Sequence, residues 1–163
     1  MDEPTPPRLP VEVTRSRRRR RTVEASIVDG VIQVRAPATM PEAELASHVS
    51  ELVTRLERRY RSDGIDLERR ARDLADRYDL PRPASIVWAD QRSRWGSCTT
   101  TTRAIRISNR LSAYPPWVLD YVIVHELAHL VVEGHDARFH AIVQRYPLAE
   151  RARGFLMAVS FGD

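Results

Sequence analysis

Apolar and polar residues follow two kinds of spacing along this chain, and the first is the alternation typical of strands. Residues 22–27 alternate polar and apolar side chains, Asp29-Gly30 is a hairpin turn signal, and residues 31–35 return as a second strand. We therefore expect an N-terminal β-hairpin region over residues 11–36.

Helical spacing follows in residues 41–80. A first helix is predicted from residue 41 to about residue 60, because apolar residues recur there every three or four positions. A second helix is predicted over residues 66–78, and prolines close this helical segment. Two short strands, residues 84–89 and 103–108, are expected next.

Residues 116–132 are apolar at nearly every position, which predicts a buried helix. Near its end this helix carries His125, Glu126 and His129. Residues four apart lie on one face of a helix, so both imidazoles can bind a single ion. Glu126 lies beside that ion and can accept a proton from a zinc-bound water, which is the chemistry of the H-E-x-x-H motif.

A zinc hydrolase needs a third protein ligand and one open position. Glu133 is too far along the same helix to reach the ion, and Asp120 points away from the two histidines. We expect Gly134 to end the helix in a left-handed cap, so that the chain reverses and brings His135 back under the ion. His140, one turn farther on, remains the alternative.

Composition agrees with a globular protein, since 42% of the 163 residues are hydrophobic and 29% are charged. The net charge is +4, and all 26 basic residues are arginines. Cys98 is the single cysteine, so no intrachain disulfide can form. The N-terminus does not resemble a signal peptide and no apolar stretch is long enough to span a membrane, so we expect a cytoplasmic protein.

We expect one domain, residues 11–163, after a loose tail at residues 1–10 that holds four prolines. The metal-binding core is expected over residues 84–146, where Asp136 caps a last helix at residues 137–146. No internal repeat and no second core are evident.

Several motifs together resemble the YgjP-like metallopeptidase family, which is similar to the SprT and WLM zincins. They are Arg94-Trp-Gly-Ser-Cys98, Asn109-Arg-Leu111, the H-E-x-x-H helix from Pro116 to His129, Gly134-His135-x-x-x-Phe139, and the Arg-Ala-Pro37 that ends the hairpin. The resemblance covers nearly the whole chain and is more specific than H-E-x-x-H alone.

The resemblance implies a zincin-like α+β fold with an N-terminal β-hairpin region, a small mixed or antiparallel sheet and an H-E-x-x-H helix. It also implies a zinc-dependent metallohydrolase, in the first place a peptidase, with Zn²⁺ on His125, His129 and His135. Glu126 would be its general acid and base. The family usually has Trp where this chain has His140, which argues against His140 as a ligand.

The segment of Arg94, Trp95, Gly96 and Ser97 is a candidate substrate-binding site. A strand edge beside the metal helix can pair with an extended peptide, and Gly96 would permit close approach of its backbone. The alternative is a tight turn whose Trp95 fills the core. Cys98 is either a fourth metal ligand or a small buried hydrophobic residue.

Two other functions remain open. Free arginines could hold phosphates, which suits a zinc hydrolase of a phosphoanhydride bond. Six arginines within Arg15–Arg21 could form a nucleic-acid-binding module, although such a run is more often a solvated strand edge. The expected partner is therefore a peptide or protein substrate, with nucleic acid or phosphate as alternatives and no membrane.

Overall fold

The computed structural model describes residues 8–160, and within them the chain forms two compact units, the first ending at Asp63 and the second beginning at Gly64. Both units combine helices with a small sheet, so the predicted α+β class is confirmed. Residues 1–7 of the predicted tail lie outside the described residues. The single domain expected from residue 11 onward stays a prediction.

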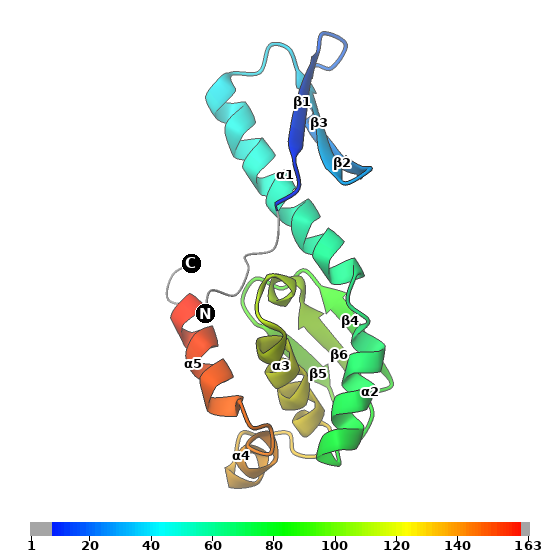
Figure 1. The fold of residues 1–163 in the computed structure, drawn as a ribbon, viewed down its shortest axis with the longest axis vertical. Helices are drawn as coiled ribbons and strands as arrows, with labels where there is room; N and C mark the ends of the chain where they lie inside the picture. Colours follow the sequence, from blue (N-terminus) through cyan, green and yellow to red (C-terminus); the bar gives the residue numbers. More distant parts are fainter. Residues whose placement is uncertain (1–7, 161–163) are drawn as a thin grey trace. The chain divides into compact units, whose positions relative to one another are not determined.

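The first unit contains a three-stranded sheet in the order β1-β3-β2 (Figure 1). Strand β1 (Val11–Ser16) runs parallel to β3 (Val31–Pro37), and β2 (Glu24–Val28) pairs with β3 in the antiparallel sense. The β2–β3 turn has positive φ at both Asp29 (51°) and Gly30 (77°), as a type I′ hairpin turn requires. The Asp-Gly signal therefore marks a hairpin, and β1 adds a third strand beside it.

Helix α1 (Glu42–Asp63) contacts β2 and β3 and covers one face of this sheet. Ile32 and Val34 of β3 are fully buried, and Leu45 of α1 is 3% exposed. A buried carboxylate, Glu57, accepts a hydrogen bond from the Leu9 backbone N–H and pairs with Arg61. This bond fixes the start of the described chain to α1.

The arginine run is mostly exposed and begins on the edge strand β1, in part as expected for a solvated strand edge. Only Arg15 lies within β1, and the other arginines of the run occupy the connection from β1 to β2. Arg15 pairs with Glu42, and the Arg19 Nη2 lies 2.5 Å from a Glu24 oxygen. Part of the positive charge of the run is thus neutralised within the first unit.

The second unit contains the sheet β4-β6-β5, in which β4 (Ser85–Ala89) runs parallel and β5 (Gly96–Thr99) antiparallel to β6 (Ala104–Ser108). Helix α2 (Leu67–Tyr78) precedes this sheet, and the carboxylate of Asp66 caps it by accepting from the Arg69 backbone N–H. The edge strand β5 begins at Gly96 and Trp95 packs against the core, so each interpretation of residues 94–97 has one feature in the structure, and substrate binding there stays a prediction.

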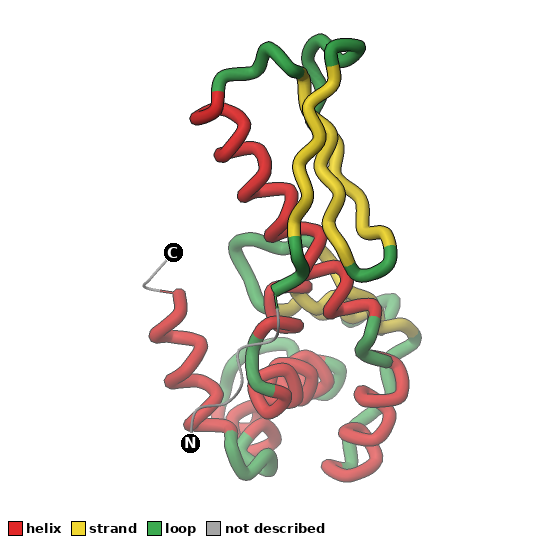
Figure 2. Tube along the Cα trace, turned by 45° about the horizontal axis from the view of Figure 1, so that its top comes forward, coloured by secondary structure: helices red, strands yellow, loops and turns green. Residues whose placement is uncertain are grey.

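A short 3₁₀ helix (Asn109–Ala113) leads to α3 (Pro116–His129), α4 (Ala137–Val143) and α5 (Ala149–Ser160). Helices α2 and α3 contact each other and both contact the sheet, and α4 and α5 pack on α3 (Figure 2). Helix α3 is therefore the centre of the unit, and its buried apolar residues are Val118, Leu119, Val122, Ile123, Val124, Leu127 and Ala128.

Three sequence predictions about this unit are wrong. The metal helix ends at His129 instead of residue 132, and Gly134 does not form a left-handed cap, since Gly30 is the glycine with positive φ among the described residues. Directly after the helix the chain forms a turn instead, in which the N–H groups of Val131 and Val132 both bond to the Ala128 carbonyl. The last predicted helix ends at Val143, and α5 was not predicted.

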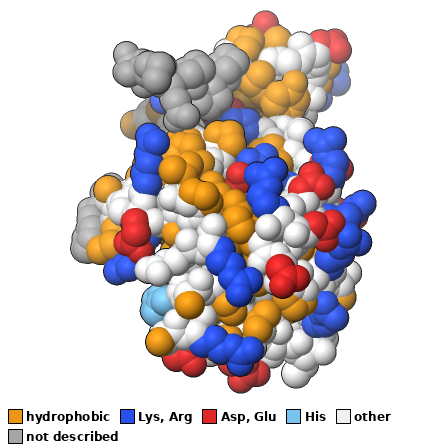
Figure 3. Space-filling view, turned by 60° about the horizontal axis from the view of Figure 1, so that its bottom comes forward, with side chains coloured by type: hydrophobic (Ala, Val, Ile, Leu, Met, Phe, Trp, Pro, Cys, Tyr) orange, Lys and Arg blue, Asp and Glu red, His pale blue; other side chains and the backbone are white. Residues whose placement is uncertain are grey.

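The surface of the protein carries both signs of charge. On the face seen in Figure 3, arginines and acidic side chains are interspersed with hydrophobic ones. Among residues 8–160, no helix is both long enough and apolar enough to cross a membrane.

Candidate metal centre

Helix α3 positions two imidazoles and one carboxylate at its C-terminal end. His125 and His129 are one turn apart, and their ring centroids are 5.1 Å apart. Pro116 lies in the first turn of the helix, where the fixed φ of proline is compatible with helical geometry. The apolar residues around the helix hold it in the core. These side chains are therefore presented by the most buried helix of the unit.

His135 comes from the segment between α3 and α4 and completes a group of three. Its Nε2 lies 3.2 Å from the Nε2 of His125, and its ring centroid lies 4.7 Å from that of His129. One ligand atom from each of the three histidines lies within 4.8 Å of the other two. The structure thus brings together the three histidines singled out by spacing.

A cap and an aromatic ring hold the His135 segment in place. Asp136 accepts a hydrogen bond of 2.9 Å from the Phe139 backbone N–H and so begins α4, as predicted. The Phe139 ring is 1% exposed and packs against the rings of all three histidines, with centroid distances of 4.6 to 4.8 Å. Phe139 therefore fixes the imidazole planes from the core side.

The three histidines fit a catalytic zinc site. Two nitrogens bound to one tetrahedral zinc at 2.0–2.1 Å are about 3.3 Å apart, close to the observed 3.2 Å between His125 and His135. Three neutral imidazoles leave one coordination position open, which distinguishes a catalytic site from a closed structural one. The donor set therefore matches a hydrolytic metal centre.

The environment favours the neutral imidazoles of His125 and His129. Burial, with smaller repulsion from the neighbouring histidines, lowers the pKa of His125 to about 4. Burial also lowers the pKa of His129, whose Nδ1 lies 3.2 Å from the Val132 carbonyl oxygen. Donation from Nδ1 to that carbonyl leaves the Nε2 lone pair of His129 available for a cation.

Glu126 is a buried carboxyl group beside these histidines, with 5% of its surface exposed. Burial raises its pKa to about 7, against a smaller opposite effect of Arg94. A carboxyl group of this pKa can accept and return a proton near neutral pH.

The side chain of Glu126 lies directly against Gly96 of β5. A Cβ atom at Gly96 would stand 2.5 Å from Glu126 Oε1 and 2.8 Å from its Cγ, which is closer than real contacts allow. The sequence suggested that Gly96 admits a substrate backbone, but the contact that requires a glycine is with Glu126. No sequence pattern signals this contact, because the two residues are far apart in the chain.

The other candidate substrate residues lie around a cavity of about 450 Å³ that contains the three histidines. Arg94 and Ser97 line it, and the Ser97 hydroxyl accepts a hydrogen bond of 3.0 Å from Gln91. Trp95 is outside this lining. It is half-buried against the core, and the Arg110 guanidinium lies 3.9 Å from its ring centroid.

The remaining ligand candidates lie outside the group of three histidines. The Asp120 carboxylate is 2.5 Å from the Arg70 guanidinium, and Glu133 accepts a hydrogen bond from Thr100. His140 is exposed and outside the group of three histidines. Cys98 lines the histidine cavity half-buried, and burial together with Glu126 raises the pKa of its thiol.

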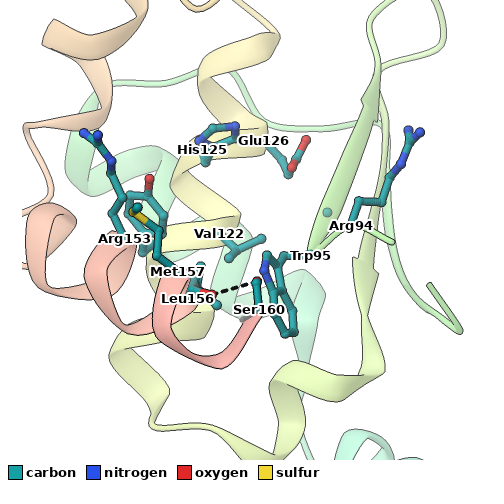
Figure 4. Close-up of a pocket in the computed structure, with 11 residues that line it drawn as sticks. Arg94, Trp95, Val122, His125, Glu126, Arg153, Leu156, Met157 and Ser160 are labelled. Atoms are coloured by element: carbon teal, nitrogen blue, oxygen red, sulfur yellow. Dashed lines mark hydrogen bonds between the residues drawn. The ribbon is translucent and has the colours of Figure 1, made fainter. Parts of the chain in front are cut away.

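Helix α5 also contributes residues beside this site, and it was not predicted from the sequence. Figure 4 shows Leu156 and Met157 of this helix opposite Val122 of α3, beside His125 and Glu126. Its apolar residues Ala152, Phe155, Leu156 and Val159 recur at helical spacing, and this signal could have revealed the helix.

Comparisons with known proteins agree with this geometry. Residues 51–156, about two thirds of the chain, match the family described as YgjP-like, metallopeptidase domain. The crystal structure of the metallopeptidase zymogen of Methanocaldococcus jannaschii jannalysin is similar with a TM-score of 0.50 and 15% identity, over 58% of this chain and 96% of that chain. At this identity the likeness shows the fold. A search of curated proteins gave no match, and no comparison supports a nucleic-acid or phosphate ligand.

Proposed function

The chain belongs to the YgjP-like metallopeptidase family, as its motifs predicted, and from this premise we propose that it is a zinc-dependent peptidase. Its proposed zinc ligands are His125, His129 and His135, and its proposed general base is Glu126. One observation carries the proposal: three imidazoles converge beside a buried carboxyl group whose pKa is about 7.

A zinc ion held by the three histidines would lower the pKa of water towards about 7 and polarise a substrate carbonyl. Glu126 accepts one proton from the attacking water, whose oxygen bonds to the carbonyl carbon. The carbon–nitrogen bond then breaks, and Glu126 returns the proton to the leaving amine. Burial supports this role because it lets one carboxyl group alternate between both protonation states near neutral pH.

Strand β5 is the proposed docking edge for the substrate backbone. It pairs with β6 on one side and lies at the end of the strand order among the described residues. Its residues Gly96, Ser97 and Cys98 line the cavity that contains the histidines. An extended peptide that pairs with this edge would bring its carbonyl groups to the metal site. Arg94 lines the same cavity and can donate to a substrate oxygen.

Metal content and turnover of purified variants test this proposal. We expect one zinc per chain, cleavage of denatured protein that stops with a chelator, and recovery on adding zinc. Glu126→Gln should keep its zinc but lose at least roughly a thousandfold in turnover, and His125→Ala should lose the zinc. Glu68→Gln, the same change at an exposed position of α2, should match the wild type. A fully active Glu126→Gln protein would refute the mechanism.

A further inference from the structure

A second cavity adjoins the metal centre, and we call it the α5 pocket. It has a volume of about 480 Å³, within the range of small-molecule sites, and is bounded by α3, α5 and the residues just before β5 (Figure 4). Its apolar walls are formed by Trp95, Tyr121, Val122, Leu156 and Met157.

The α5 pocket is continuous with the catalytic residues. Arg94, Gly96, His125 and Glu126 line both this pocket and the cavity that contains the three histidines. A substrate bound at the metal centre can therefore extend past Glu126 into the α5 pocket.

The charged residues around the pocket limit which substrate side chains it can bind. Arg94 and Arg153 line it, and among its described lining residues Glu126 is the one carboxyl group. Arg153 lies 3.7 Å from Glu150, which directs part of its charge outside the pocket. Two guanidinium groups disfavour a lysine or arginine side chain of the substrate, and the apolar walls favour a large apolar one.

We propose that the α5 pocket selects a large apolar side chain, such as that of leucine, methionine or phenylalanine, on the substrate residue that follows the cleaved bond. This proposal rests on the peptidase function proposed above. It adds the identity of the preferred residue and the helix that recognises it.

The position relative to the cleaved bond follows from the roles of the shared residues. The carbonyl that is attacked must lie at the metal, in the cavity lined by all three histidines. The α5 pocket is lined by His125 alone of the three, together with Glu126. Glu126 delivers the proton to the leaving amine, so the residue bearing that amine lies on the Glu126 side, where the α5 pocket opens.

Met157 allows a sharp test because it lines the pocket while 52% of its surface is exposed. A charge placed there should leave the fold intact but oppose an apolar ligand. Ala158→Glu provides the matched control, since it introduces the same charge at the next residue of α5, which is exposed and outside the pocket lining.

The experiment digests a peptide mixture with the zinc-loaded full chain and identifies the new N-termini by mass spectrometry. We expect enrichment of leucine, methionine and phenylalanine at the new N-terminus, and about a ten- to hundredfold loss of kcat/KM for these sites in Met157→Glu but not in Ala158→Glu. Cleavage without this preference, or an unchanged preference in Met157→Glu, would overturn the proposal and leave the peptidase function standing.

A binding measurement separates this proposal from the peptidase function. Phe-Ala-amide mimics the amine product, and Gly-Ala-amide lacks the side chain. We expect the metal-free chain to bind Phe-Ala-amide at least about tenfold more tightly by NMR titration, with the difference lost in Met157→Glu and kept in Ala158→Glu. Absence of peptide cleavage would refute the peptidase function but not the pocket assignment. Equal binding of the two amides would refute the pocket assignment.

Discussion

At the scale of single residues, the Glu126 side chain lies so close to Gly96 that a Cβ atom there would overlap it. Spacing along one helix was enough to single out His125, Glu126 and His129, because the periodicity of a helix determines which side chains are neighbours. The contact with Gly96 could not be predicted in this way. It depends on how β5 packs against α3, and neighbouring residues in the sequence carry no record of that packing.

We expect Gly96→Ala to displace the Glu126 side chain while leaving the zinc ligands in place. The added methyl group would overlap Glu126 Cγ and Oε1, and a misplacement of about 1 Å can lower turnover roughly a hundredfold. Gly154→Ala is the control, since its Cβ meets open space within α5 and should stabilise the helix by about 1 kcal/mol. Turnover and zinc content measure both. Full turnover in Gly96→Ala would show that Glu126 does not need its observed position.

Because Glu126 is buried, we expect the free energy of unfolding of the metal-free protein to depend on pH. Between about pH 4.5 and pH 7 the unfolded chain ionises Glu126 while the folded chain keeps it protonated, so the free energy of unfolding falls as the pH rises through this window. In urea unfolding with a chelator, the free energy of unfolding of Glu126→Gln should exceed that of the wild type by roughly 2–3 kcal/mol at pH 8 and by little at pH 4.5. An equal difference at both pH values would contradict the raised pKa.

At the scale of elements, the sequence predicted where helices begin better than where they end. Asp66 and Asp136 each accept from the backbone N–H three residues on, and both helix starts follow that local pattern. Helix α3 instead ends at His129, and the backbone N–H groups of Val131 and Val132 both bond to the Ala128 carbonyl beyond it. Residues 129–132 contain no glycine or proline, so the local sequence does not mark this end.

The two caps offer a matched pair of variants. We expect Asp136→Ala to cost about 1 kcal/mol of stability and, because it loosens the segment that holds His135, to weaken zinc binding about tenfold. Asp66→Ala removes an equivalent cap from α2 and should cost a similar stability with unchanged zinc affinity. Urea unfolding and competition with a chelating dye measure the two quantities. Equal zinc affinities would mean that the cap does not position His135.

At the scale of the whole molecule, the family resemblance implied the α+β class, but not the division into two compact units. The alternation in residues 22–35 indicated a hairpin, while the parallel pairing of β1 with β3 joins strands that the arginine run and β2 separate in the sequence. The same holds for β4 and β6, which are parallel neighbours in the sheet although the segment that contains β5 separates them in the sequence. Such pairings are set by the packing of distant segments, which residue periodicity does not encode.

Zinc binding should raise the thermal stability of the chain. Comparing this rise between histidine variants identifies the third ligand. A ligand that binds only the folded state adds about 2.7 kcal/mol at a hundred times its Kd. We expect added zinc to raise the Tm of the wild type and of His140→Ala equally, because His140 is exposed and lies outside the histidine group. His135→Ala should lose most of the rise, since two imidazoles remain where three converge. The opposite order of the two variants would move the third ligand to His140.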